Sequence, residues 1–108
     1  MTSAAMNAAL GALVSALARQ YAVDSIGFVC VDPGPTDTGR YVALRDSVSA
    51  QASVDGAGAD DLITGRIPTG RISTPEEIAI AITAVLSPRL AQLTGTRIVV
   101  DGAATWVR

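Results

Sequence analysis

The stretch VDPGPTDTG at residues 31–39 decides the fold, because it ends an apolar run and begins a long polar segment. The run before it, at residues 25–31, is almost continuously apolar and rich in β-forming side chains. Such a run is typical of a strand that is covered on both faces, as in a parallel sheet. Proline has no N–H for the ladder of a sheet, so the two prolines end the strand. We therefore predict a strand at residues 25–31 followed by a tight turn.

The segment before this strand predicts a helix that begins at Met1. Its large apolar side chains recur at three- and four-residue spacing and form one stripe: Met6, Leu10, Leu13, Val14, Leu17 and Tyr21. We expect this stripe to pack in the core, and a helix–helix contact between chains is the alternative. The small residues Ala8, Ala12 and Ala16 leave the other side flat enough for a second helix to approach.

Beyond the turn, the clearest boundary is the start of a helix at Thr74. Thr74 and Glu77 form a Thr-x-x-Glu capping box, and Pro75 suits the first helical turn. The buried stripe of this helix is Ile78, Ile82, Val85 and Leu86, and Ser87-Pro88 ends it. A second apolar strand follows at residues 97–100. Strands joined by a helix are parallel, so the order helix, strand, loop, helix, strand predicts an α/β fold.

Residues 36–73 predict a long polar connection inside a single domain that spans residues 1–108. One short helix can form around residues 41–48, but Gly56, Gly58 and Gly65 interrupt any longer element. Connections of this length in compact domains are usually functional loops or disordered segments.

Composition excludes several kinds of chemistry. There is no histidine, one cysteine, and all eight positive side chains are arginine. Ser/His and Cys/His nucleophiles, lysine Schiff bases and intramolecular disulfides are therefore excluded, and no metal site is expected. The net charge of −2 and the scattered arginines argue against a nucleic-acid partner. No apolar stretch approaches the roughly 20 residues of a membrane span, and we expect a cytoplasmic protein.

Four stretches resemble, in order and spacing, the carboxy-terminal part of short-chain dehydrogenases/reductases of the 3-oxoacyl reductase kind. Residues 7–18 resemble the helix with the catalytic Tyr-x-x-x-Lys, and residues 31–39 resemble the Pro-Gly turn after the sixth strand. Residues 71–79 resemble the start of the penultimate helix, and residues 94–102 resemble the last strand. The resemblance implies a fragment of a Rossmann-like doubly wound parallel sheet, in which residues 36–73 correspond to the substrate loop.

The resemblance also implies site residues. In the family the Pro-Gly turn meets the nicotinamide end of NAD(P), and the matching residues here are Pro33, Gly34, Thr36 and Thr38. No Gly-x-Gly-x-x-Gly occurs in the 108 residues, so the pyrophosphate-binding unit is absent from them. We therefore expect no cofactor to bind the isolated chain usefully.

The catalytic pair of the family does not occur in its place. The alignment puts Ser3 at the position of the tyrosine and Asn7 at the position of the lysine. Serine has too high a pKa to replace the tyrosine as proton carrier, and asparagine carries no charge. We expect no catalytic residues, and hence an oxidoreductase-family protein without independent activity. The alternatives are an oligomerisation or regulatory partner of a complete dehydrogenase, and one half of a split oxidoreductase.

The remaining candidates are weighed against plainer structural roles. Asp32 and Asp101 end two strands and could form an acid/base pair, but ordinary turn chemistry explains both better. Tyr41 stands where the family's substrate lid begins, and packing is the stronger interpretation. We expect Cys30 to be a buried structural thiol, Asp60-Asp61 to solvate a loop, and Trp106 to pack in a core or interface. A sheet of only two strands leaves an edge of the first strand unpaired. We therefore expect the chain to form a homo-oligomer or to bind a larger dehydrogenase chain.

Overall fold

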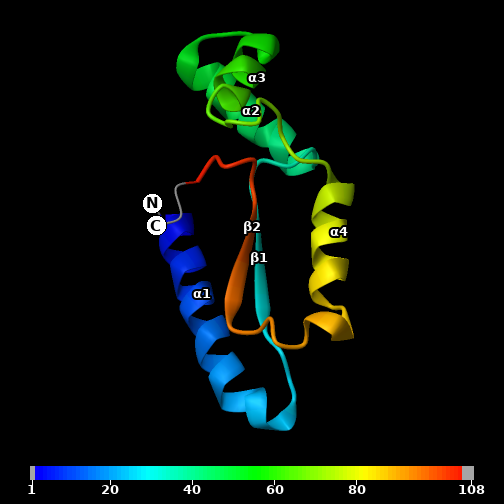
Figure 1. Ribbon diagram of the computed structural model, residues 1–108. Helices are drawn as coiled ribbons and strands as arrows, with labels where there is room; N and C mark the ends of the chain where they lie inside the picture. The colour runs from blue at the N-terminus through cyan, green and yellow to red at the C-terminus, as the bar shows by residue number, and fades with distance from the viewer. Residues whose placement is uncertain (1, 106–108) are drawn as a thin grey trace. The chain divides into compact units, whose positions relative to one another are not determined.

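The computed structural model, drawn in Figure 1, describes residues 2–105, with side chains from residue 5 onward. The elements follow in the order α1 (Thr2–Tyr21), the 3-10 helix η1 (Ala22–Asp24), β1 (Val29–Pro33), α2 (Gly39–Ala52), α3 (Gly56–Thr64), α4 (Pro75–Val85), the 3-10 helix η2 (Pro88–Leu90) and β2 (Thr96–Val100). They form two compact units. Unit 1 comprises Met1–Asp32 and Ile80–Val99, and unit 2 comprises Pro33–Ala79 and Val100–Arg108. Trp106 lies outside the described residues.

The two strands pair with each other in parallel. At the start of the pair the Gly95 N–H donates to the Phe28 carbonyl at 2.8 Å, and at its end the Gly34 N–H donates to the Val100 carbonyl at 2.9 Å. The start of β1 thus pairs with the start of β2, and the two ends pair likewise, so the strands run in the same direction. In the sequence, α4 lies between them. The predicted α/β class is confirmed.

The first strand begins later than the sequence predicts. Residues 25–28 are not part of β1, which runs from Val29 to Pro33 and so ends two residues later than predicted. The reason is the end of the preceding helix: the Ser25 N–H donates to Ala22, and the Ile26 N–H donates to Tyr21. Ser25 is also left-handed, with φ of 58°. These backbone groups complete the helix end and cannot join the ladder of the sheet.

Small residues form the face of α1 that packs on β2. The Arg97 side chain crosses at Gly11, where an added Cβ would stand 3.0 Å from Arg97 Cδ. One turn further on, the Ser15 hydroxyl donates to the Gly95 carbonyl at 3.2 Å. Ala18 is buried, and its Cβ lies 3.2 Å from the position that a Cβ on Gly95 would take. Larger side chains at these helix positions would push the strand away.

The predicted core role of the apolar stripe on α1 is therefore wrong for its first half. Met6, Leu10 and Leu13 are 67%, 47% and 52% exposed. Only the end of the stripe is covered, where the rings of Tyr21 and Phe28 lie 5.9 Å apart between centroids. The alternative, a helix–helix contact between chains, stays a prediction. The alanines at positions 8, 12 and 16 are exposed as well.

An ion pair links the two strands on the side of α1. Arg97 Nε donates to Asp32 Oδ2 at 2.6 Å, and the Cys30 thiol donates to Asp32 Oδ1 at 3.2 Å. Cys30 is 8% exposed, which confirms the predicted burial. Burial raises the pKa of the Cys30 thiol, and the hydrogen bond to Asp32 raises it further. A thiol that resists ionisation is a poor nucleophile, in agreement with a structural role.

The predicted long connection is mostly helical, which corrects the expectation for residues 36–73. The short helix expected around residues 41–48 is confirmed and is longer, as α2. The glycines at positions 56 and 58 do not interrupt α3, because they occupy its first turn. There Asp55 is the N-cap, and its carboxylate accepts the Gly58 N–H at 2.8 Å. Gly65 does mark the end of α3.

The capping box that begins α4 is confirmed. The predicted buried stripe of this helix is wrong, because no residue of α4 is buried, Ile82 is 43% exposed, and Leu86, just after the helix, is 74% exposed. The Glu77 N–H donates to Thr74 Oγ1 at 3.2 Å, and the Thr74 N–H donates to Glu77 Oε2 at 2.9 Å. Arg71 donates to both carboxylate oxygens of Glu77, at 2.8 and 2.6 Å. The hydrogen bonds from Arg71 and then from Thr74 lower the pKa of Glu77 to about 2. No described helix is long and apolar enough to cross a membrane.

Replacing the cap gives a first testable prediction. Thr74→Ala removes the acceptor for the Glu77 N–H and should lower the free energy of unfolding by about 1 kcal/mol, measured from urea denaturation curves. Thr74→Ser retains the hydroxyl and serves as the matched control, with a midpoint close to that of the unmodified chain. An unchanged midpoint for Thr74→Ala would show that this hydrogen bond does not stabilise α4.

Candidate functional site

The turn at Pro33–Thr38 is fixed by a short parallel bridge to Ser73 in unit 2. The Asp37 N–H donates to the Ser73 carbonyl, and the Ser73 N–H donates to the Pro35 carbonyl, both at 2.9 Å. The bridge is therefore centred on Thr36. In a parallel bridge the central residue directs its own N–H and C=O away from the partner strand. Thr36 thus turns a backbone donor and a backbone acceptor to the side opposite Ser73.

The hydroxyls of Thr36 and Thr38 donate hydrogen bonds to carbonyl groups of the same turn. Thr36 Oγ1 donates to the Gly34 carbonyl at 2.9 Å, and Thr38 Oγ1 donates to the Thr36 carbonyl at 3.3 Å. Each hydroxyl keeps acceptor capacity after it has donated. The side of the turn away from Ser73 therefore presents one N–H donor, one shared carbonyl and a threonine hydroxyl. A primary carboxamide, with one C=O and one NH₂, matches this pattern of groups.

Two glycines allow the backbone to approach closely beneath the turn. A Cβ on Gly34 would lie 2.7 Å from Asp101 Cβ and 2.8 Å from Asp101 Cα. A Cβ on Gly102 would lie 2.2 Å from Thr69 Oγ1, and Gly102 has φ of 61°. Both distances are too short for any other residue without movement of the backbone. Gly34, which was predicted as a cofactor-binding residue, thus also has a packing role in unit 2.

The two strand-end aspartates each have hydrogen-bond partners within their own unit. Asp32 belongs to unit 1, where it pairs with Arg97, and Asp101 belongs to unit 2. The Asp101 carboxylate accepts the N–H groups of Ala103 and Thr105, at 2.9 and 2.8 Å. Turn chemistry therefore accounts for Asp101, as expected, whereas Asp32 has an ion-pair role that the sequence analysis missed. Hydrogen bonding to Thr105 lowers the pKa of Asp101, against the opposing effect of burial.

Both positions predicted to correspond to the catalytic pair lie on α1. Asn7 is exposed on the helix, and the side chain of Ser3 is outside the described part. Across residues 5–105 no group of three or more His, Cys, Asp or Glu side chains could hold a metal ion. The identification of Ser3 and Asn7 with the tyrosine and lysine positions remains a prediction.

Tyr41 and Asp60 join α2 to α3 within unit 2. The Tyr41 hydroxyl donates to Asp60 Oδ1 at 2.7 Å, and Tyr41 is 9% exposed. Ala59, Ile63 and Ile67 are the other buried hydrophobic residues described in this unit. Packing is therefore the observed role of Tyr41. The expectation that Asp60-Asp61 solvates a loop is wrong, because both residues lie in α3 and Asp60 accepts this hydrogen bond.

The hydrogen bond to Asp60 leads to a prediction in alkaline solution. Burial first, and then Asp60, raise the pKa of Tyr41 from 10.0 to about 12. The neutral phenol is the donor, so the α2–α3 contact is complete below pH 10.0 and is lost as the pH rises toward about 12. The phenolate absorbance of the unmodified chain minus that of Tyr41→Phe should titrate near 12, and Asp60→Asn should lower that midpoint. A Tyr41 midpoint near 10.0 in the unmodified chain contradicts the prediction.

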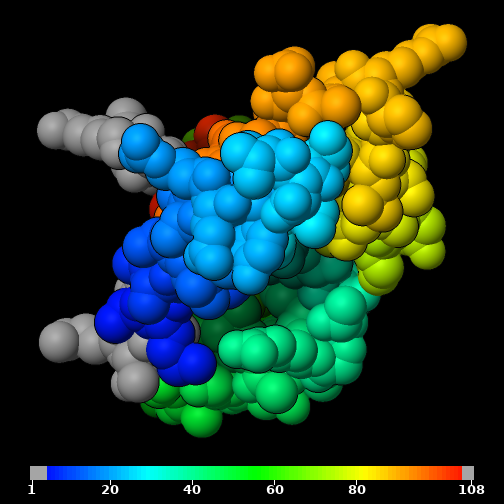
Figure 2. Space-filling model, turned by 90° about the horizontal axis from the view of Figure 1, so that it is seen from below, coloured from blue at the N-terminus to red at the C-terminus, as the bar shows by residue number. Residues whose placement is uncertain are grey.

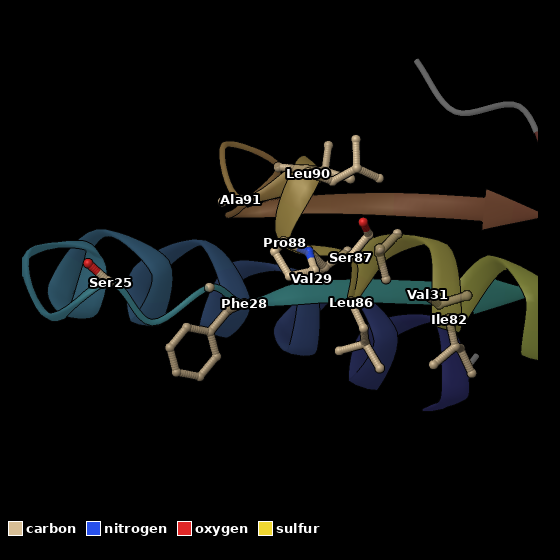
Figure 3. Close-up of a pocket in the computed structure, with 13 residues that line it drawn as sticks. Ser25, Phe28, Val29, Val31, Ile82, Leu86, Ser87, Pro88, Leu90 and Ala91 are labelled. Atoms are coloured by element: carbon tan, nitrogen blue, oxygen red, sulfur yellow. The ribbon is translucent and has the colours of Figure 1, made fainter.

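A half-open groove of about 650 Å³ runs beside β1 in unit 1. Val29 and Val31 of β1 line it together with the end of α4 and η2, and no charged side chain takes part. Figure 3 shows Phe28, Ile82 and Leu86 pointing to the same side of the strand. Figure 2 shows the segment after α1, in light blue, beside the end of α4 and η2, in yellow and orange.

Sequence comparison places this structure in a family. The family model described as enoyl-(acyl carrier protein) reductase matches residues 2–105. NADPH-dependent reductase BacG of Bacillus subtilis (strain 168) is 30% identical over 103 residues, which are 95% of this chain and 40% of BacG. The chain thus spans about two-fifths of the length of this relative.

Solved structures agree with the sequence match. YwfH, an NADPH-dependent reductase involved in bacilysin biosynthesis, superposes with a TM-score of 0.87 at 28% identity, over 95% of this chain and 39% of YwfH. A variant of actinorhodin polyketide ketoreductase with NADPH gives a TM-score of 0.85 at 28% identity, over 91% and 38%. The four motifs, the parallel pair of strands and these matches lead to one conclusion. The chain belongs to the short-chain dehydrogenase/reductase family.

Proposed function

We propose that this chain supplies the nicotinamide-binding side of an NAD(P)-linked oxidoreductase site, through Pro33, Gly34, Thr36 and Thr38. The observation that carries the proposal is the bridge between Thr36 and Ser73. It turns the Thr36 N–H and C=O outward, and a nicotinamide carboxamide offers the complementary acceptor and donor. When bound, NAD(P) would supply the hydride chemistry. The residues of this chain would hold and orient the nicotinamide ring.

We propose further that the 108 residues alone do not catalyse carbonyl reduction. The proton carrier of the family is a tyrosine whose pKa a neighbouring lysine lowers, and α1 has Ser3 and Asn7 at the matching positions. Restoring Ser3→Tyr and Asn7→Lys should leave the chain inactive, because no pyrophosphate-binding motif occurs in the 108 residues.

A titration followed by NMR tests the proposed binding role. Nicotinamide mononucleotide should shift the backbone amide signals of Gly34, Thr36, Asp37, Thr38 and Ser73, with a dissociation constant on the order of 1 mM or weaker. Calorimetry with NAD and NADP should show no saturable heat, because most of the dinucleotide has no binding partner in this chain. Shifts confined to other residues, or a micromolar dissociation constant for NAD(P), contradict the proposal.

A second candidate function is association with a complete dehydrogenase, or with a second copy as a homo-oligomer. The exposed half of the α1 stripe and the groove beside β1 favour it, because both are apolar surfaces in unit 1. One half of a split oxidoreductase is a special case, in which the other chain supplies the phosphate site. The single free thiol, Cys30, fits a cytoplasmic location, which we include in the proposal.

A further inference from the structure

Asp101 is the only buried charged side chain among the residues whose side chains are described. Burial of a carboxylate is costly unless hydrogen bonds replace its hydration. The Asp101 carboxylate accepts two backbone N–H groups, those of Ala103 and Thr105, which replace its lost hydration. The Asp101 carbonyl accepts a third, from Ala104 at 3.1 Å. Asp101 therefore holds the chain after β2 in one tight turn.

This turn contacts the Pro33–Thr38 turn directly. The Gly34 N–H donates to the Val100 carbonyl, and Gly34 packs on Asp101 so closely that an added Cβ would lie 2.7 Å from Asp101 Cβ. The backbone of Asp101 decides where its Cα and Cβ stand. Because the Asp101 carboxylate accepts the N–H groups of Ala103 and Thr105, it holds the backbone of this turn, and with it the surface beneath Gly34.

The turn after β2 also contacts the segment that leads to Ser73, the bridge partner of Thr36. The Gly102 carbonyl accepts the Thr69 N–H at 3.3 Å, and Gly102 packs on Thr69 and Ile67. The chain then runs from Thr69 to Ser73, which forms the bridge to Thr36. Asp101 thus stands between the two segments that together determine where the Thr36 backbone points, and all of these contacts lie within unit 2.

We propose that Asp101 is a positioning residue, which orients the Thr36 backbone N–H and C=O toward the nicotinamide carboxamide. This inference rests on the proposed function of the Pro33–Thr38 turn. Asp101 does not touch the carboxamide. It acts by holding Gly34 and Ser73 in register, through the turn after β2.

Hydrogen exchange in the 108-residue chain tests the positioning role without any ligand. The Asp37 and Ser73 amides donate the two hydrogen bonds of the bridge, so they report on its opening. Asp101→Ala should accelerate their exchange roughly tenfold or more, relative to the Ala59 amide in α3. Asp101→Asn should restore part of the protection, because its amide oxygen can still accept one N–H. Unchanged exchange at Asp37 and Ser73 in Asp101→Ala would overturn the inference.

Asp55→Ala is the matched control, since Asp55 also accepts a backbone N–H in unit 2, that of Gly58. It should alter α3 and leave the bridge amides protected. If Asp101→Ala does not fold, Thr105→Pro removes one of the two N–H donors and leaves the carboxylate in place. The same acceleration is expected, and protected bridge amides in that variant would overturn the inference.

Titration with nicotinamide mononucleotide then separates the two proposals. The shifts expected at the backbone amides of the Pro33–Thr38 turn should disappear in Asp101→Ala and remain in Asp55→Ala. Absence of shifts in the unmodified chain contradicts the proposed function, whereas the exchange comparison still decides whether Asp101 holds the bridge. Shifts that survive unchanged in Asp101→Ala contradict the positioning role alone.

Discussion

Gly34→Ala should lower the free energy of unfolding by about 2–3 kcal/mol and abolish the shifts caused by nicotinamide mononucleotide. The new Cβ would stand 2.8 Å from Asp101 Cα, a backbone atom that cannot rotate away as the end of a side chain can. Either the Pro33–Thr38 turn or the turn after β2 must move. In both cases the hydrogen bond between the Gly34 N–H and the Val100 carbonyl is lost or lengthened.

Gly39→Ala is the matched control, because nothing lies within 4 Å of its added Cβ. Gly39 is the first residue of α2, and its φ is not positive. Alanine there should be neutral or stabilise the chain by up to about 1 kcal/mol, since it reduces the freedom of the unfolded state. Denaturation curves of the two variants measure the difference. Equal midpoints for Gly34→Ala and Gly39→Ala would show that the close approach at Asp101 is relieved without cost.

Local signals in the sequence predicted the elements that depend on neighbouring residues. The capping box at Thr74 and Glu77 forms as the sequence predicts, because both residues lie within one helical turn. The glycine-rich start of α3 was misinterpreted, although Asp55 supplies a local cap. Glycine in the first turn costs less than glycine in a helix interior, since the N–H groups there have no partner within the helix.

Hydrophobic periodicity found α1 but assigned its buried side incorrectly. The stripe of large side chains suggested the core, whereas Gly11, Ser15 and Ala18 face the strand. Which side of α1 is covered depends on the segments that pack against it. The Arg97 side chain crosses α1 at Gly11 and reaches Asp32. That ion pair joins residues far apart in the sequence, so no local pattern could show it.

The candidate site was predictable in part. The motif at residues 31–39 identified the turn, but nothing in it points to Ser73 or to Asp101. Ser73 acts through its backbone, which carries no signature in its side chain. Asp101 was recognised as a turn residue, and its position beneath Gly34 follows only from tertiary packing.

We expect the chain to self-associate through α1, which would at least double the measured mass. Met6, Leu10 and Leu13 lie on one side of the helix and are each about half exposed or more. Apolar residues at this spacing form a seam that a second helix can cover, and a two-fold dimer is the simplest closed arrangement. The groove beside β1 adds a second uncovered apolar surface in the same unit. Light scattering at micromolar concentration should therefore report at least twice the mass of one chain.

Leu13→Arg places a charge in the middle of the seam and should reduce the measured mass to that of one chain. Ala12→Arg introduces the same charge one residue earlier, on the alanine side of α1, and should leave the mass unchanged if the leucine stripe makes the contact. A lower mass for Ala12→Arg alone would assign the contact to the alanine side instead. Circular dichroism of both variants checks that α1 remains helical, because arginine is a good helix former. An unmodified chain that stays folded and monomeric at high concentration would show that neither side of α1 associates.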